Sequence, residues 1–144
     1  MKETSKTCDV GKWIYSEKVR EHFFNPQNML IDDADYEADG IGIVGSPTCG
    51  DMMVVWIKVD SKEDRITECK WRTFGCASAI ASTSMMSVMV TENGGTELKK
   101  AKRLTAEAII ERLDGLPDLK YHCSVLSHQA LREAVIDYEE NHGK

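Results

Sequence analysis

The stretch from residue 40 to residue 74 holds three consecutive segments of strand-forming residues, and this feature constrains the fold most. In the first segment, 40–44, glycine alternates with isoleucine, and the second, 52–59, is dense in valine, isoleucine and tryptophan. The third, 66–74, alternates along its length, which is typical of a strand with one buried face. Because only short polar segments join them, we predict an antiparallel meander of three strands.

The alternation of the third segment predicts which of its side chains are buried. The face expected to be buried carries Thr67, Cys69, Trp71 and Thr73. Cys69 has no evident partner there, so we interpret it as a small buried apolar residue.

Helical patterns flank the strands. Ser16 is a candidate N-cap for a first helix, which Asn25-Pro26 ends. After the strands we expect helices over 76–90, 104–113 and 124–140, with a loop at 93–100. Within the first of these, Met85, Met86 and Met89 are expected to fill the core. A helix, three strands and then helices predict an α+β fold, in which helices pack against a three-stranded antiparallel sheet.

Length, charge and cysteine count limit the classes of protein to which this chain can belong. The 144 residues suit one domain, which we expect to span 15–144 after a flexible N-terminal tail at 1–14. A net charge of −6 argues against a nucleic-acid partner, and no apolar run is long enough for a membrane span. The polar start shows no secretory signal, so we predict a cytoplasmic protein. Five cysteines, an odd number, favour free thiols or metal ligands over a disulfide framework.

Three cysteines fall at junctions between predicted elements. Cys49 lies in the turn between the first two strands, Cys76 between the third strand and a helix, and Cys123 before the last helix. A helix N-terminus stabilises thiolate, which is both the nucleophile and the metal ligand. Asp51 and His122 are next to these cysteines, and the five residues are a workable ligand set for iron or zinc.

Each of these residues has a plainer interpretation when it is taken alone. A single cysteine is as readily a small buried residue as a ligand, and Asp51 could simply shape its turn. The remaining histidines, His22, His128 and His142, are predicted to lie on the surface.

Three runs of residues favour the ligand interpretation together. They are Gly-Ser-Pro-Thr-Cys-Gly-Asp at 45–51, Thr-Phe-Gly-Cys-Ala-Ser-Ala-Ile-Ala-Ser at 73–82, and Leu-Pro-Asp-Leu-Lys-Tyr-His-Cys-Ser at 116–124. In this order they resemble the motifs of the IscU/NifU-type iron–sulfur cluster scaffold proteins, and the opening 15–19 also matches. The resemblance covers 15–138, nearly the whole chain.

The resemblance implies a scaffold and carrier rather than an enzyme. Such proteins assemble a [2Fe–2S] cluster and pass it to apo-proteins. Their sulfur arrives as persulfide from a pyridoxal-phosphate cysteine desulfurase, Fe²⁺ arrives separately, and a ferredoxin or another reductant supplies electrons. By the resemblance, Cys49, Cys76 and Cys123 are the cluster cysteines and His122 lies near the site. Asp51 corresponds to the non-cysteine ligand or ligand-exchange residue. Cys123 is the first candidate for the persulfide acceptor, and Cys76 the second.

The third motif departs from the family at one position. Bacterial and mitochondrial members have Pro-Pro in a stretch that an Hsp70-type chaperone reads, whereas this chain has Pro117 followed by Asp118. The departure argues against such a chaperone as a partner, although Lys120 is retained. The sequence leaves open whether one subunit holds the cluster or a homodimer shares it.

Two other functions are compatible with parts of the sequence. A zinc-binding sulfur acceptor of the SufU type, which activates a cysteine desulfurase, shares the fold, and zinc could occupy the site in isolated protein. That branch typically has a longer insertion between the second and third cysteines and lacks the histidine equivalent to His122. A cysteine-nucleophile enzyme using Cys76 and His122 has the minimum of a thiol near a base, but the sequence offers no oxyanion device.

Overall fold

The elements follow the predicted α+β order. The computed structural model describes residues 16–30, 36–46, 51–74, 77–114 and 121–143, so the predicted N-terminal tail lies outside the described residues. The strands are β1 (Gly40–Ser46), β2 (Asp51–Asp60) and β3 (Arg65–Phe74). The helices are α2 (Glu17–Phe24), α3 (Ala77–Thr91), α4 (Leu98–Lys102), α5 (Ala106–Arg112) and α6 (Tyr121–Tyr138), with short turns η2 (Glu92–Gly94) and η4 (Glu139–Gly143).

The three strands form an antiparallel meander in the order β1-β2-β3, as predicted. Ser46 at the end of β1 pairs with Asp51 at the start of β2. Met52 in turn pairs with Phe74 at the end of β3. The end of β1, the start of β2 and the end of β3 therefore lie together, and we call this the Asp51 end of the sheet.

A β-bulge changes the phase of β3. Val59 pairs with Ile66 but Lys58 pairs with Glu68, so Thr67 is an extra residue in β3. The prediction that Thr67 shares the buried face with Cys69 is therefore wrong, because Thr67 is exposed and Ile66 is fully buried in its place. Beyond the bulge the predicted alternation holds, and Cys69 and Trp71 are both buried.

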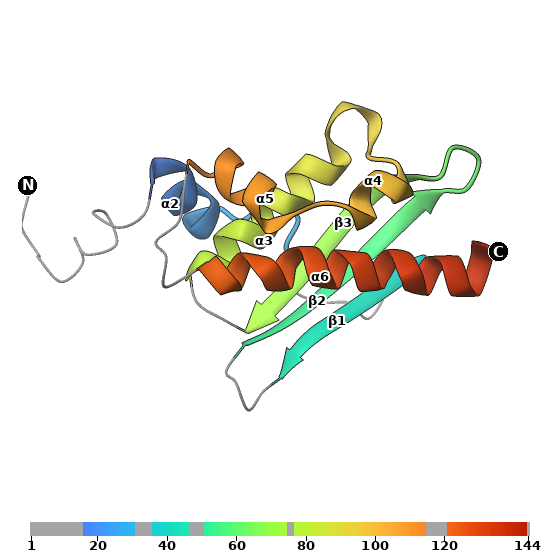
Figure 1. The fold of residues 1–144 in the computed structure, drawn as a ribbon, viewed down its shortest axis with the longest axis horizontal. Coiled ribbons are helices and arrows are strands. Elements are labelled where there is room, and N and C mark those ends of the chain that lie inside the picture. Colours follow the sequence, from blue (N-terminus) through green and yellow to red (C-terminus); the bar gives the residue numbers. More distant parts are fainter. Residues whose placement is uncertain (1–15, 31–35, 47–50, 75–76, 115–120, 144) are drawn as a thin grey trace, which may run out of the picture.

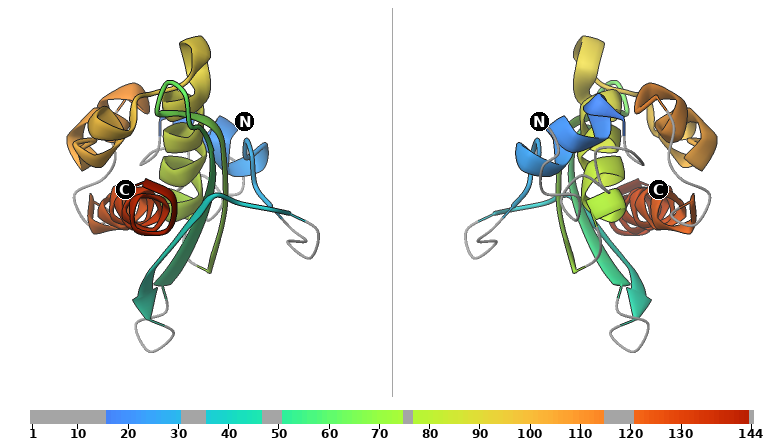
Figure 2. Two further views of the ribbon diagram at one scale, coloured as in Figure 1. Left: turned by 90° about the vertical axis from the view of Figure 1, so that its right-hand side faces the viewer. Right: turned by 90° about the vertical axis from the view of Figure 1, so that its left-hand side faces the viewer.

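Two helices cover one face of the sheet. α6 contacts β1 and β2, and α3 contacts β3 (Figure 1). Figure 2 shows α3 and α6 on the same side of the sheet, with α4 and α5 outside them. The core between these layers includes Met53, Ile57, Trp71, Met86 and Leu131. Met85 and Met86 are buried and Met89 is packed against the core, as predicted. None of the helices in the described ranges has the length and apolarity needed to cross a membrane.

Glycine allows α6 to lie directly on β1. A Cβ atom added at Gly42 would come within 2.0 Å of the Ala130 carbonyl oxygen, and one at Gly40 within 2.3 Å of the Ala134 carbonyl oxygen. Gly42 faces Ala130 and Gly40 faces Ala134, so residue numbers increase along α6 as they decrease along β1, and the two elements run antiparallel. From Gly42, four strand residues reach Ser46 over about 13 Å. From Ala130, nine helical residues lead back to Tyr121 over about the same length, so α6 begins level with the Asp51 end.

Buried serines of α3 hold the N-terminal part of the described chain. Ser84 Oγ accepts a hydrogen bond from the backbone N–H of Gln27 at 2.8 Å and lies 2.6 Å from His22 Nδ1. Ser87 Oγ accepts from Asn28 Nδ2 at 3.0 Å. These hydrogen bonds use hydroxyls that are fully buried, so α2 and the segment after it are docked by directional contacts as well as by apolar packing.

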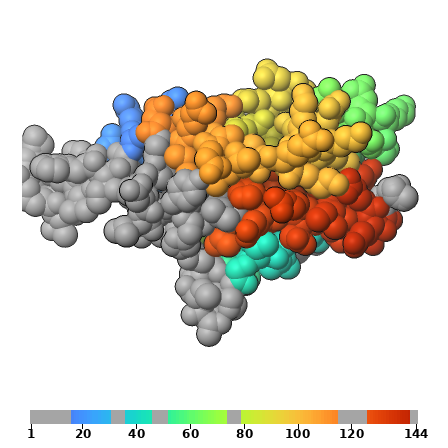
Figure 3. Space-filling view, viewed as in Figure 1, coloured from blue at the N-terminus to red at the C-terminus, as the bar shows by residue number. Residues whose placement is uncertain are grey.

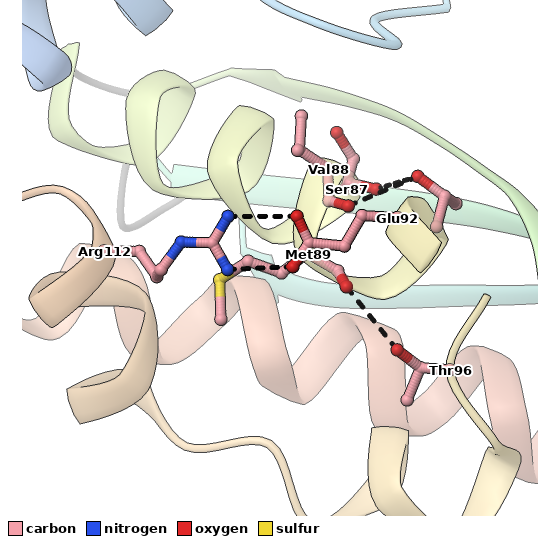
Figure 4. A network of polar contacts seen from close by, with 7 residues as sticks. Ser87, Val88, Met89, Glu92, Thr96 and Arg112 are labelled. Carbon is pink, nitrogen blue, oxygen red and sulfur yellow. Dashed lines mark hydrogen bonds and ion pairs between the residues drawn. The ribbon is translucent and has the colours of Figure 1, made fainter. Parts of the chain in front are cut away.

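The predicted loop at 93–100 is instead partly helical. Asn93 lies in η2, and α4 begins at Leu98, which is buried together with Ala101. Arg112 of α5 makes two hydrogen bonds to the Glu92 carboxylate, at 2.9 and 3.1 Å (Figure 4). This pair connects α5 to the end of α3, and α4 and α5 lie in a row along α6 (Figure 3).

The glycine contact gives a stability prediction. Gly42→Ala should lower the free energy of unfolding by up to about 3 kcal/mol, because the new methyl group overlaps backbone atoms of α6 that have no room to move aside. Urea denaturation measures the loss. Ile43→Ala is the control, since Ile43 is the neighbouring residue but is 60% exposed; it should shift stability by about 0.5 kcal/mol or less. A Gly42→Ala protein as stable as the wild type would contradict the close packing of α6 on β1.

Candidate functional site

The structure describes part of the predicted ligand set. Cys49 and Cys76 lie outside the described residues. Asp51 is the first residue of β2. His122 and Cys123 are the second and third residues of α6, so the prediction that Cys123 precedes this helix is wrong: the helix begins three residues earlier than expected. For these three the backbone is described and the side chains are not. The site is therefore built from the elements that carry these residues.

The covalent chain limits where the two remaining cysteines can be. Cys49 comes two positions before Asp51, and Cys76 comes one position before Ala77, the first residue of α3. Since consecutive Cα atoms are about 3.8 Å apart, neither cysteine can be far from the start of its element. The question is then whether the starts of β2, α3 and α6 lie together.

A set of buried contacts joins these three starts. Thr83 of α3 lies 3.3 Å from the sulfur of Met53, measured from its Oγ1. The same Thr83 Oγ1 lies 2.8 Å from Ser127 Oγ of α6. Met53 is two residues after Asp51, and Ser127 is four residues, about one helical turn, after Cys123. One threonine hydroxyl therefore contacts both β2 and α6 close to their starts.

The course of α6 along β1 leads to the same end of the molecule. Its antiparallel path brings Tyr121 level with Ser46, which pairs with Asp51. β3 also ends there, opposite Met52, and α3 begins three residues after Phe74. The backbone segments that carry Asp51, His122 and Cys123 therefore lie together at the Asp51 end of the sheet.

Helix termini add a favourable potential at this end. α3 has 15 residues and α6 has 18, and neither has an acidic residue in its first turn. The unpaired N–H groups of a helix N-terminus carry a partial positive charge, which stabilises thiolate and carboxylate groups placed beside it. This potential suits ligands that must be deprotonated before they bind iron.

Cys69 differs from the three junction cysteines. It is fully buried in β3, and burial raises the pKa of its thiol to about 12. Such a thiol stays protonated at neutral pH and packs as an apolar group. The interpretation of Cys69 as a small buried residue is confirmed.

Two histidines predicted to lie on the surface are half-buried instead. Burial lowers the pKa of His22, and its Nδ1 contacts Ser84 at 2.6 Å. Burial also lowers the pKa of His128, whose Nδ1 is buried without a hydrogen-bond partner among the described residues. The side chain of His142 lies outside the described part. Within that part, no group of three or more histidine, cysteine, aspartate or glutamate side chains is placed to hold a metal ion.

Sequence reasoning missed the hydroxyls that join the elements. Ser82, Thr83 and Ser127 are fully buried, and we call them the hydroxyl cluster. Their signal was present in the sequence, because serine and threonine occupy positions that the helical period places among apolar residues. The order of motifs alone did not reveal which hydroxyls would meet.

Comparison with known proteins identifies the family. A model of the NifU-like N terminal domain matches residues 14–144. The iron-sulfur cluster assembly scaffold protein IscU 1 of Archaeoglobus fulgidus is 47% identical over 132 residues, which cover 91% of this chain and 80% of that protein. The chain belongs to this family. IscU of Escherichia coli is 42% identical, over 87% of this chain and 94% of that protein.

The solved structures agree on the fold. The N-terminal part of a NifU-like protein from Brucella abortus superposes with a TM-score of 0.65, covering 91% of this chain and 97% of that one, at 18% identity. The family resemblance found in the three motifs is confirmed, and with it the α+β fold. As a member of the IscU/NifU family, the chain is an iron–sulfur cluster assembly scaffold and not an enzyme.

The shifted histidines give a prediction for stability against pH. In an unfolded chain His22 and His128 titrate near about 6.5, whereas burial lowers both pKa values in the folded protein. As pH falls below 6.5 the unfolded state takes up protons that the folded state does not, so the free energy of unfolding must decrease. The decrease should be absent above pH 7.

The measurement is urea denaturation at pH 5 to 7. His22→Gln should flatten the decrease, and His22→Gln with His128→Gln should flatten it further. Glu92 does not interfere, because Arg112 lowers the pKa of its carboxyl and its titration belongs to more acidic pH. An unchanged slope in the double variant would show that these imidazoles titrate alike in both states.

Proposed function

We propose that this chain builds a [2Fe–2S] cluster on Cys49, Cys76 and Cys123, with Asp51 or His122 as the fourth ligand, and passes it to apo-proteins. The observation that supports this most directly is the contact of Thr83 with both Met53 and Ser127. It brings the starts of β2, α3 and α6 together, and these starts are where the proposed ligands are attached. Ligands so far apart in sequence would otherwise have no reason to form one site.

The assembly chemistry needs sulfur, iron and electrons. A pyridoxal-phosphate cysteine desulfurase would deliver sulfur as a persulfide on Cys123, or on Cys76 as the second choice. The sulfane sulfur of each persulfide must gain two electrons to become bridging sulfide. For a cluster of two ferric irons and two sulfides, the two Fe²⁺ ions would give two of the four electrons as they are oxidised to Fe³⁺, and a ferredoxin or another reductant would supply the other two. Fe²⁺ enters as a substrate and binds the thiolates, and each binding cysteine loses its proton. Cluster and chain part again on transfer, so the cluster is cargo.

The proposed ligand set explains why the cargo can leave. A permanent cluster is usually held by four thiolates. Here one position is a carboxylate or an imidazole, and a carboxylate is a harder ligand that holds cluster iron less strongly than thiolate. A site with one exchangeable ligand can open at that position and accept a thiolate from the recipient protein.

The partners follow from the chemistry. The proposal includes a cysteine desulfurase, an electron donor and apo iron–sulfur acceptors, in a reducing compartment such as the cytoplasm. The described part of the chain favours neither a single subunit nor a homodimer as the holder of the cluster. An Hsp70-type chaperone is not included, because Asp118 replaces a proline of its recognition stretch. One scaffold domain over 15–144 is sufficient for these steps.

Reconstitution with cysteine variants tests the proposal. Protein that is incubated without oxygen with Fe²⁺, cysteine and a desulfurase should bind iron and sulfide in equal amounts and should gain a visible [2Fe–2S] spectrum. The product should load an apo-ferredoxin. Cys49→Ser, Cys76→Ser and Cys123→Ser should each abolish the stable cluster. Cys69→Ala should retain it, because this buried thiol is not a ligand.

Two outcomes would contradict the proposal. Equal loss in the Cys69→Ala protein would mean that the cysteines act through folding and not as ligands. Tightly bound zinc, no cluster and stimulated desulfurase turnover would indicate the zinc-binding sulfur acceptor instead.

Asp51→Ala tests the exchangeable ligand. Removing the carboxylate should slow cluster loss and transfer to apo-ferredoxin, because the imidazole of His122, which suits iron better than a carboxylate, would then hold the fourth position. The half-times of cluster loss and transfer are read from the visible spectrum. If Asp51→Ala prevents reconstitution altogether, Asp51 is required for assembly and the exchange role is wrong.

A further inference from the structure

The hydroxyl cluster lies in the interior between α3 and α6. Ser82, Thr83 and Ser127 are all 0% exposed. Ser127 Oγ is 2.8 Å from Thr83 Oγ1 and 3.2 Å from Ser82 Oγ. Three polar side chains in an apolar core need a physical reason, because a buried hydroxyl is stable only when it is hydrogen-bonded.

The protons of the cluster can be assigned by counting. Each hydroxyl has one proton to donate. Thr83 is 2.6 Å from the carbonyl oxygen of Ala79, a nearer and stronger acceptor than the Met53 sulfur at 3.3 Å. Thr83 therefore donates to Ala79 and accepts from Ser127. The proton of Ser127 is thus used on Thr83, and the proton of Thr83 on the backbone of α3. Such chains strengthen one another. The Ser82 hydroxyl has two acceptors within reach, Ser127 Oγ at 3.2 Å and the Ala79 carbonyl oxygen at 3.3 Å.

The cluster also has a defined place relative to the proposed ligands. Thr83 is six residues, less than two helical turns, after Ala77, which begins α3 and follows Cys76 in the sequence, and Ser127 is about one turn after Cys123. The hydrogen bond between Thr83 and Ser127 is therefore a direct link between the two helices whose first turns lead to these cysteines. Apolar contacts tolerate sliding and rotation of helices, whereas a hydrogen bond requires a narrow range of distance and angle.

We propose that Thr83 and Ser127 are positioning residues for cluster assembly. Their hydrogen bond sets the separation and rotation of the first turns of α3 and α6, and thereby the separation of the Cys76 and Cys123 sulfurs. This inference rests on the proposed function, because the distance between the two cysteines matters only if both bind the same cluster. Ser82 lies beside the pair, with its Oγ 3.2 Å from Ser127 Oγ.

The test compares hydroxyl losses at the cluster with one elsewhere in the same helix. Thr83→Val keeps the shape of the side chain and removes the hydroxyl, and Ser127→Ala removes its partner. Ser87→Ala is the matched control. Ser87 is equally buried but lies in the C-terminal half of α3. Its hydroxyl donates to the Ser84 carbonyl oxygen and accepts from Asn28 Nδ2. Thr83→Ser restores a hydroxyl and should restore function.

The first measurement is the half-life of the reconstituted cluster, together with its visible circular dichroism. Thr83→Val and Ser127→Ala should each shorten the half-life about tenfold, the range found when groups that orient metal ligands are removed. Their circular dichroism should change, since it reports the geometry around the irons. Ser87→Ala should keep the wild-type half-life and spectrum even where urea denaturation shows an equal loss of stability. If the half-life simply follows stability across all variants, the residues are structural and the proposal is wrong.

The second measurement does not require a cluster. Dibromobimane becomes fluorescent when it bridges two neighbouring thiols. In apo-protein that carries Cys8→Ser and Cys49→Ser it reports the approach of Cys76 and Cys123, because the remaining Cys69 is buried. Bridging should be slowed about tenfold by Thr83→Val and unchanged by Ser87→Ala. If the wild type forms no cluster but bridging follows this pattern, the proposed function fails and the positioning inference stands. Equal bridging in all variants would overturn the inference, whether or not the cluster forms.

Discussion

The close packing of α6 on the edge strand β1 determines where the rest of the structure can lie. Gly40 and Gly42 have no side chains, and backbone atoms of α6 occupy the space that their Cβ atoms would fill. A helix held in this way has little freedom to slide, so its first turn is set against the end of β1. Since β1 pairs with β2 through Ser46 and Asp51, one strand–helix contact aligns α6 with β2, two of the segments that carry proposed ligands.

The second constraint is polar and lies in α3. This helix has buried serine and threonine on two sides. Ser84 and Ser87 bind the segment that follows α2, while Ser82 and Thr83 face α6. Buried hydroxyls add little net stability compared with apolar side chains, but they specify which partner sits at which distance. α3 thus fixes the positions of both the segment that follows α2 and α6, because buried hydroxyls of α3 are hydrogen-bonded to each of them.

Much of this arrangement was predictable from the sequence. The strands were found because alternation and β-branched residues coincide between 40 and 74. The role of the junction cysteines stays a prediction, drawn from the change of period beside each of them. Thr67 was misplaced because alternation cannot reveal an inserted residue. α4 was missed because its two buried residues, Leu98 and Ala101, are too few to show a period. The hydroxyl cluster was missed because hydrogen bonds between distant helices depend on their packing, which no local pattern contains.

The central claim is that the Asp51 end of the sheet provides three thiolates and one oxygen or nitrogen ligand to a two-iron cluster. The Mössbauer spectrum of protein reconstituted with ⁵⁷Fe²⁺, cysteine and a desulfurase tests this claim most directly. The account predicts two quadrupole doublets of equal area, one from an iron surrounded by sulfur alone and one from an iron with an oxygen or nitrogen ligand. A single doublet from irons with identical all-sulfur surroundings would contradict it.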